Sequence, residues 1–185
     1  MRKTLGLCAL VSFVAFSASI QAQGAPSGVT TILIVRHAEK ASEPAADPPL
    51  TAAGAARAES LAQLVADAGV RTVVSTQFVR SRSTATPTAD RLGIPAEILD
   101  ARLTPRATAD SLLARHRGQT VLLVGHSNTV PAIIEALGAP RPPDICDSGY
   151  DNLFVITIPA QGPAASTHLH FGAPAPCAGS ATMKP

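Results

Sequence analysis

The stretch Thr31-Ile-Leu-Ile-Val-Arg-His-Ala-Glu-Lys40 decides the fold and begins the candidate site. Residues 32–35 form a short, largely β-branched apolar run, which is typical of a strand covered on both faces in an α/β sheet. Arg36 and His37 follow at the carboxyl end of this strand, where ligands bind in open α/β sheets. The stretch therefore predicts a buried strand that delivers a guanidinium and an imidazole to an anion site. The alternative is an Arg and a His that merely cap the sheet.

Downstream of this strand, further strand and helix patterns alternate along the chain. Strands are expected at 71–75, 95–100, 120–124, 153–158 and 167–171, and helices at about 51–68, 78–91, 108–117 and from near 128 to 137. Pro87 is expected to disturb the second helix, and the last two strands are expected to form a hairpin. The alternation predicts an α/β fold, a three-layer sandwich in which a mainly parallel sheet carries helices on both faces.

The first expected helix has a recognisable start and one apolar side. Thr51 is a suitable N-cap residue. Leu61, Leu64, Val65 and Ala68 form an apolar stripe at helical spacing.

Length and composition limit the class of protein. The 185 residues suit one domain with a sizeable core. Charged residues make up 15% and aromatic residues 3%, with no Trp, so an aromatic stacking platform for nucleic acid is not expected. We expect a single domain over 29–171, followed by a loose tail rich in Pro, Ala, Gly and Ser over 172–185.

The first 22 residues have the pattern of a signal peptide. Arg2 and Lys3 form a basic region, 5–16 an apolar region and 17–22 a stretch of small residues suited to cleavage after Ala22. The apolar run is shorter than the roughly 20 residues that a spanning helix needs. We therefore expect a periplasmic or secreted protein without stable membrane association after cleavage.

Export changes the charge balance and the cysteine count. Cleavage removes Arg2 and Lys3 from the 15 basic residues, which leaves as many basic residues as the 13 acidic ones. A formally neutral protein has no global field for a polyanion, so nucleic acid is not an expected partner. Cys146 and Cys177 remain, and an oxidising compartment favours a disulfide between them over two free thiols.

Polar residues follow three of the expected parallel strands, and the carboxyl ends of such strands share one edge of the sheet. Arg36 and His37 follow the first strand, Arg80 lies shortly after the second, and His126 follows the fourth. Guanidinium groups match phosphoryl oxygens in pairs, and imidazole can attack phosphorus. The helix expected to start near Asn128 would add backbone N–H donors. No carboxylate cluster accompanies these residues, so neither a metal nor a cofactor is expected.

Four ordered motifs resemble those of the histidine phosphatase superfamily, also called phosphoglycerate mutase-like. They are Val35-Arg-His-Ala-Glu-Lys40, Leu50-Thr-x-x-Gly54, the segment 75–85 with Arg80 and Thr84-Ala85, and Val124-Gly-His-Ser-Asn128. The pattern is most similar to compact bacterial members such as phosphohistidine phosphatases. The resemblance implies the phosphoglycerate mutase-like fold, with His37 as the phosphorylated nucleophile. Arg36, Arg80 and His126 would then bind the phosphoryl oxygens.

By this resemblance the chain is a phosphoric monoester hydrolase that acts through a phosphohistidine intermediate. Its expected partner is a small phosphorylated substrate or a phosphoprotein. The chain departs from the family at the proton donor, because Leu103-Thr104-Pro105 stands where many members have Leu-x-Glu. The acid phosphatase branch has an aspartate after its second histidine, and this chain has Ser127 there. Glu39 is the candidate donor instead, with Glu43 and Asp47 on the same loop after His37 as alternatives. Ser127 and Asn128 are candidate substrate-binding residues.

Two other functions fit parts of the pattern. Gly125-His-Ser-Asn-Thr129 nearly matches the Gly-x-Ser-x-Gly elbow of serine esterases, with Ser127 as nucleophile, although Thr129 replaces the last glycine. Acidic residues and histidines follow it in the right chain order, at Asp144, Asp147, Asp151, His168 and His170. Alternatively, the missing proton donor indicates a phosphate-binding module that has lost catalysis.

Overall fold

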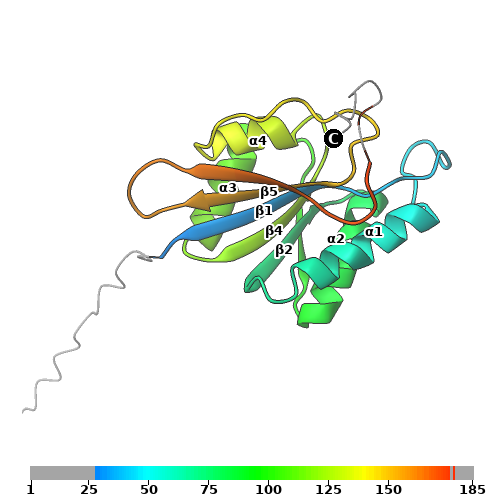
Figure 1. Ribbon diagram of the computed structural model, residues 1–185, viewed down its shortest axis with the longest axis horizontal. Helices are drawn as coiled ribbons and strands as arrows, with labels where there is room; N and C mark the ends of the chain where they lie inside the picture. Colours follow the sequence, from blue (N-terminus) through cyan, green and yellow to red (C-terminus); the bar gives the residue numbers. More distant parts are fainter. Residues whose placement is uncertain (1–27, 176, 178–185) are drawn as a thin grey trace, which may run out of the picture.

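The computed structural model describes residues 28–175 and 177, and Figure 1 shows how their elements are arranged. The predicted signal peptide, and residues 176 and 178–185 of the predicted tail, lie outside the described residues. Six strands form one sheet: β1 (Thr30–Arg36), β2 (Val70–Thr76), β3 (Ala96–Leu99), β4 (Thr120–Gly125), β5 (Asn152–Ile158) and β6 (Ala165–His170). Four helices flank it: α1 (Ala52–Leu64), α2 (Val79–Leu92), α3 (Pro105–His116) and α4 (Val130–Ala136).

The strand order is β3-β2-β4-β1-β5-β6. The first four strands in this order run parallel, whereas β5 is antiparallel to β1 and pairs with β6 as the predicted hairpin. One face of the sheet packs against α1 and α2, and the other packs against α3 and α4. The α/β sandwich with a mainly parallel sheet is confirmed.

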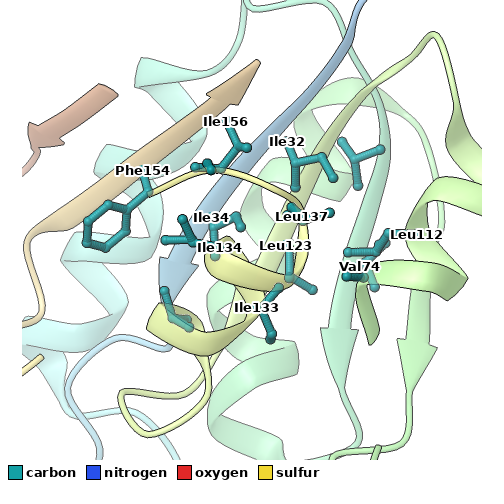
Figure 2. Close-up of a cluster of buried hydrophobic side chains, with 14 of the residues drawn as sticks. Ile32, Ile34, Val74, Leu112, Leu123, Ile133, Ile134, Leu137, Phe154 and Ile156 are labelled. Carbon is teal, nitrogen blue, oxygen red and sulfur yellow. The ribbon is translucent and has the colours of Figure 1, made fainter. Parts of the chain in front are cut away.

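The two faces of β1 explain its uninterrupted apolar sequence. Leu33 and Val35 belong to the core under α1 and α2, and Ile32 and Ile34 belong to the core under α3 and α4. All four side chains are at most 5% exposed, and burying each one contributes about 1.5–3 kcal/mol. Figure 2 shows the second of these cores, a buried cluster to which both Ile34 and the α4 residue Ile134 belong.

The first helix follows the prediction at its start and departs from it at its end. The Thr51 side chain accepts a hydrogen bond from the Gly54 N–H and caps α1 as expected. The helix ends at Leu64 instead of residue 68, and Leu64 and Ala68 are exposed while Leu61 and Val65 are buried. Half of the predicted stripe was therefore wrong. In a segment so rich in alanine, the apolar pattern alone does not define one buried face.

Three other predicted helix features need correction. Helix α3 starts at Pro105, three residues early, because the Thr104 side chain caps it by accepting from the Ala107 N–H. Helix α4 starts at Val130, later than expected, because a turn follows β4 first. Helix α2 continues unbroken through Pro87.

The segment after α4 is irregular and is linked covalently to the end of the described chain. The structure joins Cys146 and Cys177 in the expected disulfide. Among the helices of the described residues, none has the length and apolar character needed to cross a membrane.

Candidate active site

The two candidate histidines meet because their strands are neighbours in the sheet. Arg36 pairs in register with Gly125, so His37 and His126 are the next residues along β1 and β4. The His37 N–H donates to the Gly125 carbonyl over 3.0 Å. The two imidazole rings lie edge to face, with centroids 5.4 Å apart. The sheet edge therefore brings together the histidines that the sequence places 89 positions apart.

The environment of His37 sets its tautomer and its charge. Its Nδ1 lies 2.8 Å from the Ala38 carbonyl oxygen, and a carbonyl only accepts, so Nδ1 carries the proton. Burial is the largest cause that lowers the pKa of His37, to about 4; the charges of Arg36, His126 and Arg80 act in the same direction, against the hydrogen bond to Ala38. At neutral pH the ring is therefore uncharged and its Nε2 has a free lone pair, as a nucleophile requires.

The backbone after His37 is tied to α2 through Thr84. The Ala38 N–H donates to the Thr84 hydroxyl over 2.9 Å, and this hydroxyl donates to the Arg80 carbonyl over 2.8 Å. The carbonyl that orients the imidazole is thus held relative to the helix turn that carries Arg80. The sequence motif contains Thr84, but this connecting role becomes visible only in the structure.

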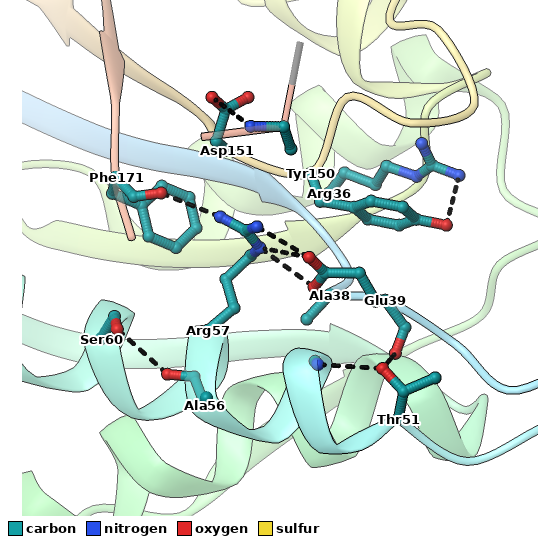
Figure 3. A network of polar contacts seen from close by, with 12 residues as sticks. Arg36, Ala38, Glu39, Thr51, Ala56, Arg57, Ser60, Tyr150, Asp151 and Phe171 are labelled. Atoms are coloured by element: carbon teal, nitrogen blue, oxygen red, sulfur yellow. Dashed lines mark hydrogen bonds and ion pairs between the residues drawn. The ribbon is translucent and has the colours of Figure 1, made fainter. Parts of the chain in front are cut away.

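Arg36 is held by the irregular segment before β5. Its Nη1 donates to the Cys146 and Asp147 carbonyls over 2.9 and 2.8 Å. Its guanidinium carbon lies 4.1 Å from the centroid of the Tyr150 ring, and Figure 3 shows the two groups together. Arg36 is 6% exposed, and its buried Nε has no hydrogen-bond partner within the described residues. The Nε and Nη2 edge is therefore suited to a pair of phosphoryl oxygens.

Arg80 has a similar environment at the first turn of α2. Its guanidinium carbon lies 4.3 Å from the centroid of the Phe78 ring, and its Nη1 lies 3.5 Å from a carboxylate oxygen of Asp47. The same carboxylate accepts the Val79 N–H and caps the helix start. The Nε of Arg80, like that of Arg36, is buried without a partner in the part of the chain that the structure describes. Both candidate arginines thus stack on aromatic rings and keep a buried donor unused.

The charges of both candidate arginines act on His126. Its Nε2 is 3.0 Å from the Thr76 hydroxyl at the end of β2, and the Phe78 ring meets it edge to face at 5.6 Å. Burial first, and then the charges of Arg80 and Arg36, lower the pKa of His126 to about 4. In the free protein at neutral pH the positive charge of the site therefore comes from the arginines.

Ser127 and Asn128 lie in the turn between β4 and α4, beside His126. Ser127 is partly buried and Asn128 is exposed, and neither side chain forms a hydrogen bond within the described chain. The N–H groups of Thr129 and Val130 already donate to the His126 carbonyl. These two N–H groups are therefore already bonded. The start of α4 offers a phosphoryl group fewer free N–H donors than the sequence predicts.

The contacts of Glu39 do not suit a proton donor. Its carboxylate receives three hydrogen bonds from Arg57 on α1, the shortest 2.7 Å long, and Arg57 also donates to the Phe171 carbonyl (Figure 3). Burial alone raises the pKa of Glu39, but the hydrogen bonds and charge of Arg57, together with Arg36, outweigh it and lower the pKa. A carboxylate kept ionised holds no proton to donate. Glu39 instead anchors α1 to the strand end.

The loop after β3, where many family members carry their acid, provides no free carboxyl group. A small cavity of about 30 Å³ separates this loop from His126, and its lining includes Leu99 and Leu103. Asp100 also lines it, but its carboxylate is bound to Arg102, whose hydrogen bonds lower the pKa of Asp100 to about 2. Of the carboxylates that the sequence offers as donors, Asp47 is the one in contact with a candidate arginine.

The structure does not assemble a serine esterase triad. Ser127 follows β4, whereas His168 and His170 lie on β6, three strands away in the sheet order. At about 4.8 Å per strand this separation is roughly 14 Å, too far for a hydrogen bond. Asp151 does pair with His170, at 3.2 Å, but His170 lies on β6, out of reach of Ser127.

Comparison with known proteins agrees with this geometry. Residues 32–106 match the model of the histidine phosphatase superfamily, branch 1. The solved structure of the protein histidine phosphatase SixA complexed with tungstate is 21% identical, with a TM-score of 0.59, and the match covers 76% of this chain and 96% of that one. The putative phosphohistidine phosphatase SixA from Agrobacterium tumefaciens is 26% identical, with a TM-score of 0.59 and coverage of 78% and 99%.

A more distant phosphatase shares the fold. The mycobacterial glucosyl-3-phosphoglycerate phosphatase is 14% identical, with a TM-score of 0.55, and the match covers 70% of this chain and 90% of that one. No curated protein matches the chain in sequence.

The matched range contains the strand-end pair Arg36 and His37 as well as Arg80. The sheet brings His126, which lies beyond that range, beside His37. The family model matches the part of the chain that carries His37 and both arginines, and the fold is that of the phosphatase neighbours, so the chain is similar to the histidine phosphatase superfamily of hydrolases.

Proposed function

We propose that the protein is an exported phosphatase that hydrolyses phosphoric monoesters through a phosphohistidine intermediate on His37. The observation that carries the proposal is the hydrogen bond from His37 Nδ1–H to the Ala38 carbonyl, which leaves Nε2 unprotonated. Its low pKa keeps the ring neutral over the whole physiological pH range.

In the first step, Nε2 of His37 attacks phosphorus in line with the leaving oxygen. The new P–N bond forms as the P–O bond breaks, and the leaving group takes its proton from solvent. Arg36, Arg80 and His126 hold the phosphoryl oxygens as charge spreads over them in the transition state. In the second step, water attacks the same phosphorus, the P–N bond breaks, and phosphate leaves with His37 restored.

The missing donor narrows the substrate class. Glu39 and Asp100 are both held ionised by arginines. Leaving groups that need no proton from the enzyme are therefore favoured, such as aryl oxides, or the imidazole of a phosphohistidine whose other ring nitrogen is already protonated and which leaves as neutral imidazole. Two of the structural neighbours are named as putative phosphohistidine phosphatases. The proposed substrate of this chain is a small phosphorylated compound or a phosphoprotein.

Export is the second part of the proposal. Residues 1–22 have the three regions of a signal peptide, and a disulfide such as Cys146–Cys177 persists in oxidising compartments. The protein then acts in the periplasm or outside the cell. Cell fractionation with an antibody against the folded domain tests this part, and a cytoplasmic chain that still carries residues 1–22 would contradict it.

A non-catalytic phosphate-binding module is the remaining alternative, and the absence of a free carboxyl group at the described site favours it. Turnover of p-nitrophenyl phosphate separates the two functions. We expect the wild type to be active, His37→Ala to be inactive and Ser127→Ala to retain most of its activity. Phosphate binding without turnover would support the module. Cleavage of a carboxylic ester that Ser127→Ala abolishes and His37→Ala retains would support the esterase.

A further inference from the structure

We propose that Tyr150 is a positioning residue for the phosphoryl-binding guanidinium of Arg36. This inference rests on the proposed function, since it assigns Arg36 to phosphoryl binding. Tyr150 lies outside the residues matched by the family model, 32–106. Its aromatic ring orients the arginine from a segment more than 100 residues away in sequence.

Three contacts from this segment leave the guanidinium little freedom. The Tyr150 ring lies 4.1 Å from the guanidinium carbon, and stacking on the ring fixes the plane of the group. The carbonyls of Cys146 and Asp147 take the two N–H groups of Nη1 and fix its rotation within that plane. Figure 3 shows the ring and the guanidinium lying against each other.

The same contacts determine which edge of Arg36 remains for a ligand. Nη1 is fully used by the two carbonyls, and Nε is buried without a partner among the described residues. Within the described part of the chain, Nη2 meets only the Tyr150 hydroxyl, at the long distance of 3.5 Å. The Nε–Nη2 edge has the fork geometry that binds two oxygens of a phosphoryl group.

Tyr150 also lies beside the nucleophile. Its ring centroid is 6.2 Å from that of His37, at an angle of 51°. One ring therefore contacts both the group that attacks phosphorus and the group that holds its oxygens. A shift of the ring would change phosphate affinity and the alignment of the attack together.

The segment that carries Tyr150 is a well-defined turn. The Gly149 N–H donates to the Cys146 carbonyl, and the disulfide to Cys177 ties this turn to the end of the described chain. A Cβ on Gly149 would lie 3.2 Å from side-chain atoms of Asn152 and Ile145 and 3.3 Å from the Cys146 carbonyl, so the turn is closely packed. The position of the ring is therefore fixed by the fold.

The ring, and not the hydroxyl, makes the close contact, and this difference defines the test. Full-length wild type, Tyr150→Leu and Tyr150→Phe are compared for binding of inorganic phosphate by calorimetry and for KM and kcat with p-nitrophenyl phosphate. We expect Tyr150→Leu to weaken phosphate binding about tenfold, because the cation–π contact is lost in a partly buried site. Tyr150→Phe should stay within about twofold of the wild type, because its ring is retained.

Phe171→Leu is the matched control. Phe171 faces Arg57 at 5.8 Å, so the substitution also removes an aromatic ring from an arginine, but from one outside the phosphoryl site. We expect it to lower thermal stability and leave phosphate affinity unchanged. Wild-type phosphate binding by Tyr150→Leu would overturn the inference. A Tyr150→Phe variant as weak as Tyr150→Leu would overturn it too, because the hydroxyl would then be the active part.

A measurement on the wild type covers the case in which Tyr150→Leu does not fold. The Nε–H resonance of Arg36 is followed by NMR during titration with inorganic phosphate, and we expect a large, saturable shift. An unmoved resonance at phosphate saturation would show that this edge is not the binding edge. Because phosphate binding needs no turnover, these results stay separate from a failure of the phosphatase proposal, which would appear as an inactive wild type that still binds phosphate.

Discussion

His37 donates its Nδ1 proton to the carbonyl oxygen of Ala38, the next residue in the chain, over 2.8 Å. A contact this local orients the ring and selects its tautomer without another side chain. The carbonyl is fixed in turn, because the Ala38 N–H is bound to Thr84 on α2. Nucleophile, tautomer and helix are thus coupled through two backbone groups of one residue.

The two site histidines make protein stability depend on pH. Their pKa values are lowered from 6.5 to about 4 in the folded protein, chiefly by burial. The unfolded chain therefore binds more protons between pH 6.5 and pH 4, so stability is complete above 6.5 and is lost as the pH falls toward 4. We expect a slope of up to about 2.7 kcal/mol per pH unit from the pair.

Urea unfolding of the wild type at several pH values measures this slope. His37→Gln is the control, and it should remove about half of the slope, because a single titrating histidine of the pair remains. A wild-type stability that stays constant from pH 6.5 to pH 4.5 would contradict the buried, neutral state of both rings.

Reaction rates should depend steeply on the leaving group. Because the Leu103-Thr104-Pro105 segment lacks the expected glutamate and Asp100 is bound to Arg102, the leaving oxygen departs without a positioned acid. We expect p-nitrophenyl phosphate to react much faster than alkyl phosphates under single-turnover conditions. A chemical step that is insensitive to leaving-group pKa would reveal a proton donor at the site.

Substitution of Asp47 tests whether such a proton donor exists at the site. Its carboxylate lies 3.5 Å from Arg80 and accepts the Val79 N–H at the start of α2. Asp47→Asn retains an oxygen for the Val79 N–H and removes the charge that competes with phosphate for Arg80. We therefore expect phosphate to bind up to about threefold more tightly, with an unchanged ratio of aryl to alkyl phosphate turnover.

The measurement is the turnover of aryl and alkyl phosphates by the wild type and by Asp47→Asn under the same conditions. A selective loss of alkyl phosphate turnover in the variant would identify Asp47 as the general acid and refute its assignment as a helix cap and counter-charge.

The disulfide should support both stability and the site. Cys146 and Cys177 are 31 residues apart, and closing a loop of this length stabilises a protein by roughly 3–4 kcal/mol in the chain-entropy model. The Cys146 carbonyl also binds Arg36. We expect thiol reductant to lower the melting temperature and to weaken phosphate binding.

The Cys146→Ser/Cys177→Ser double variant is the control for the reductant. It should resemble the reduced wild type and should not respond to thiols. Unchanged phosphate affinity after complete reduction would show that the disulfide does not contribute to the position of Arg36.

The sequence was sufficient to predict which candidate site residues lie at the carboxyl ends of buried strands. The apolar run before Arg36 and the one before His126 mark two buried strands, and parallel strands bring their carboxyl ends to one edge. The strand order that makes β1 and β4 direct neighbours is a property of the whole sheet. It was therefore the resemblance to a family, more than periodicity, that joined these residues into one site.

The aromatic partners of the arginines could not be predicted in the same way. Tyr150 lies in an irregular segment without periodicity, 114 residues from Arg36. Phe78 looked like an ordinary helix-start residue, although its ring contacts both Arg80 and His126. Contacts of this kind depend on where a loop returns to the sheet, and local sequence patterns do not contain that information.

Glu39 is a residue for which the sequence position suggested a role that its contacts do not suit. Its position two residues after His37 made it a reasonable donor, but a buried arginine on α1 holds its carboxylate. Arg57 gave no signal in sequence, because an arginine inside a helix is usually exposed.

Trapping of the intermediate tests the central claim most directly. Wild-type protein is mixed with ³²P-labelled aryl phosphate, quenched rapidly in alkali and digested, and the labelled peptide is sequenced. Because phosphohistidine is stable in alkali and labile in acid, we predict an alkali-stable label on His37 of the wild type that is absent from His37→Ala. Full phosphatase activity in His37→Ala, or an acid-stable label on another residue, would contradict the account.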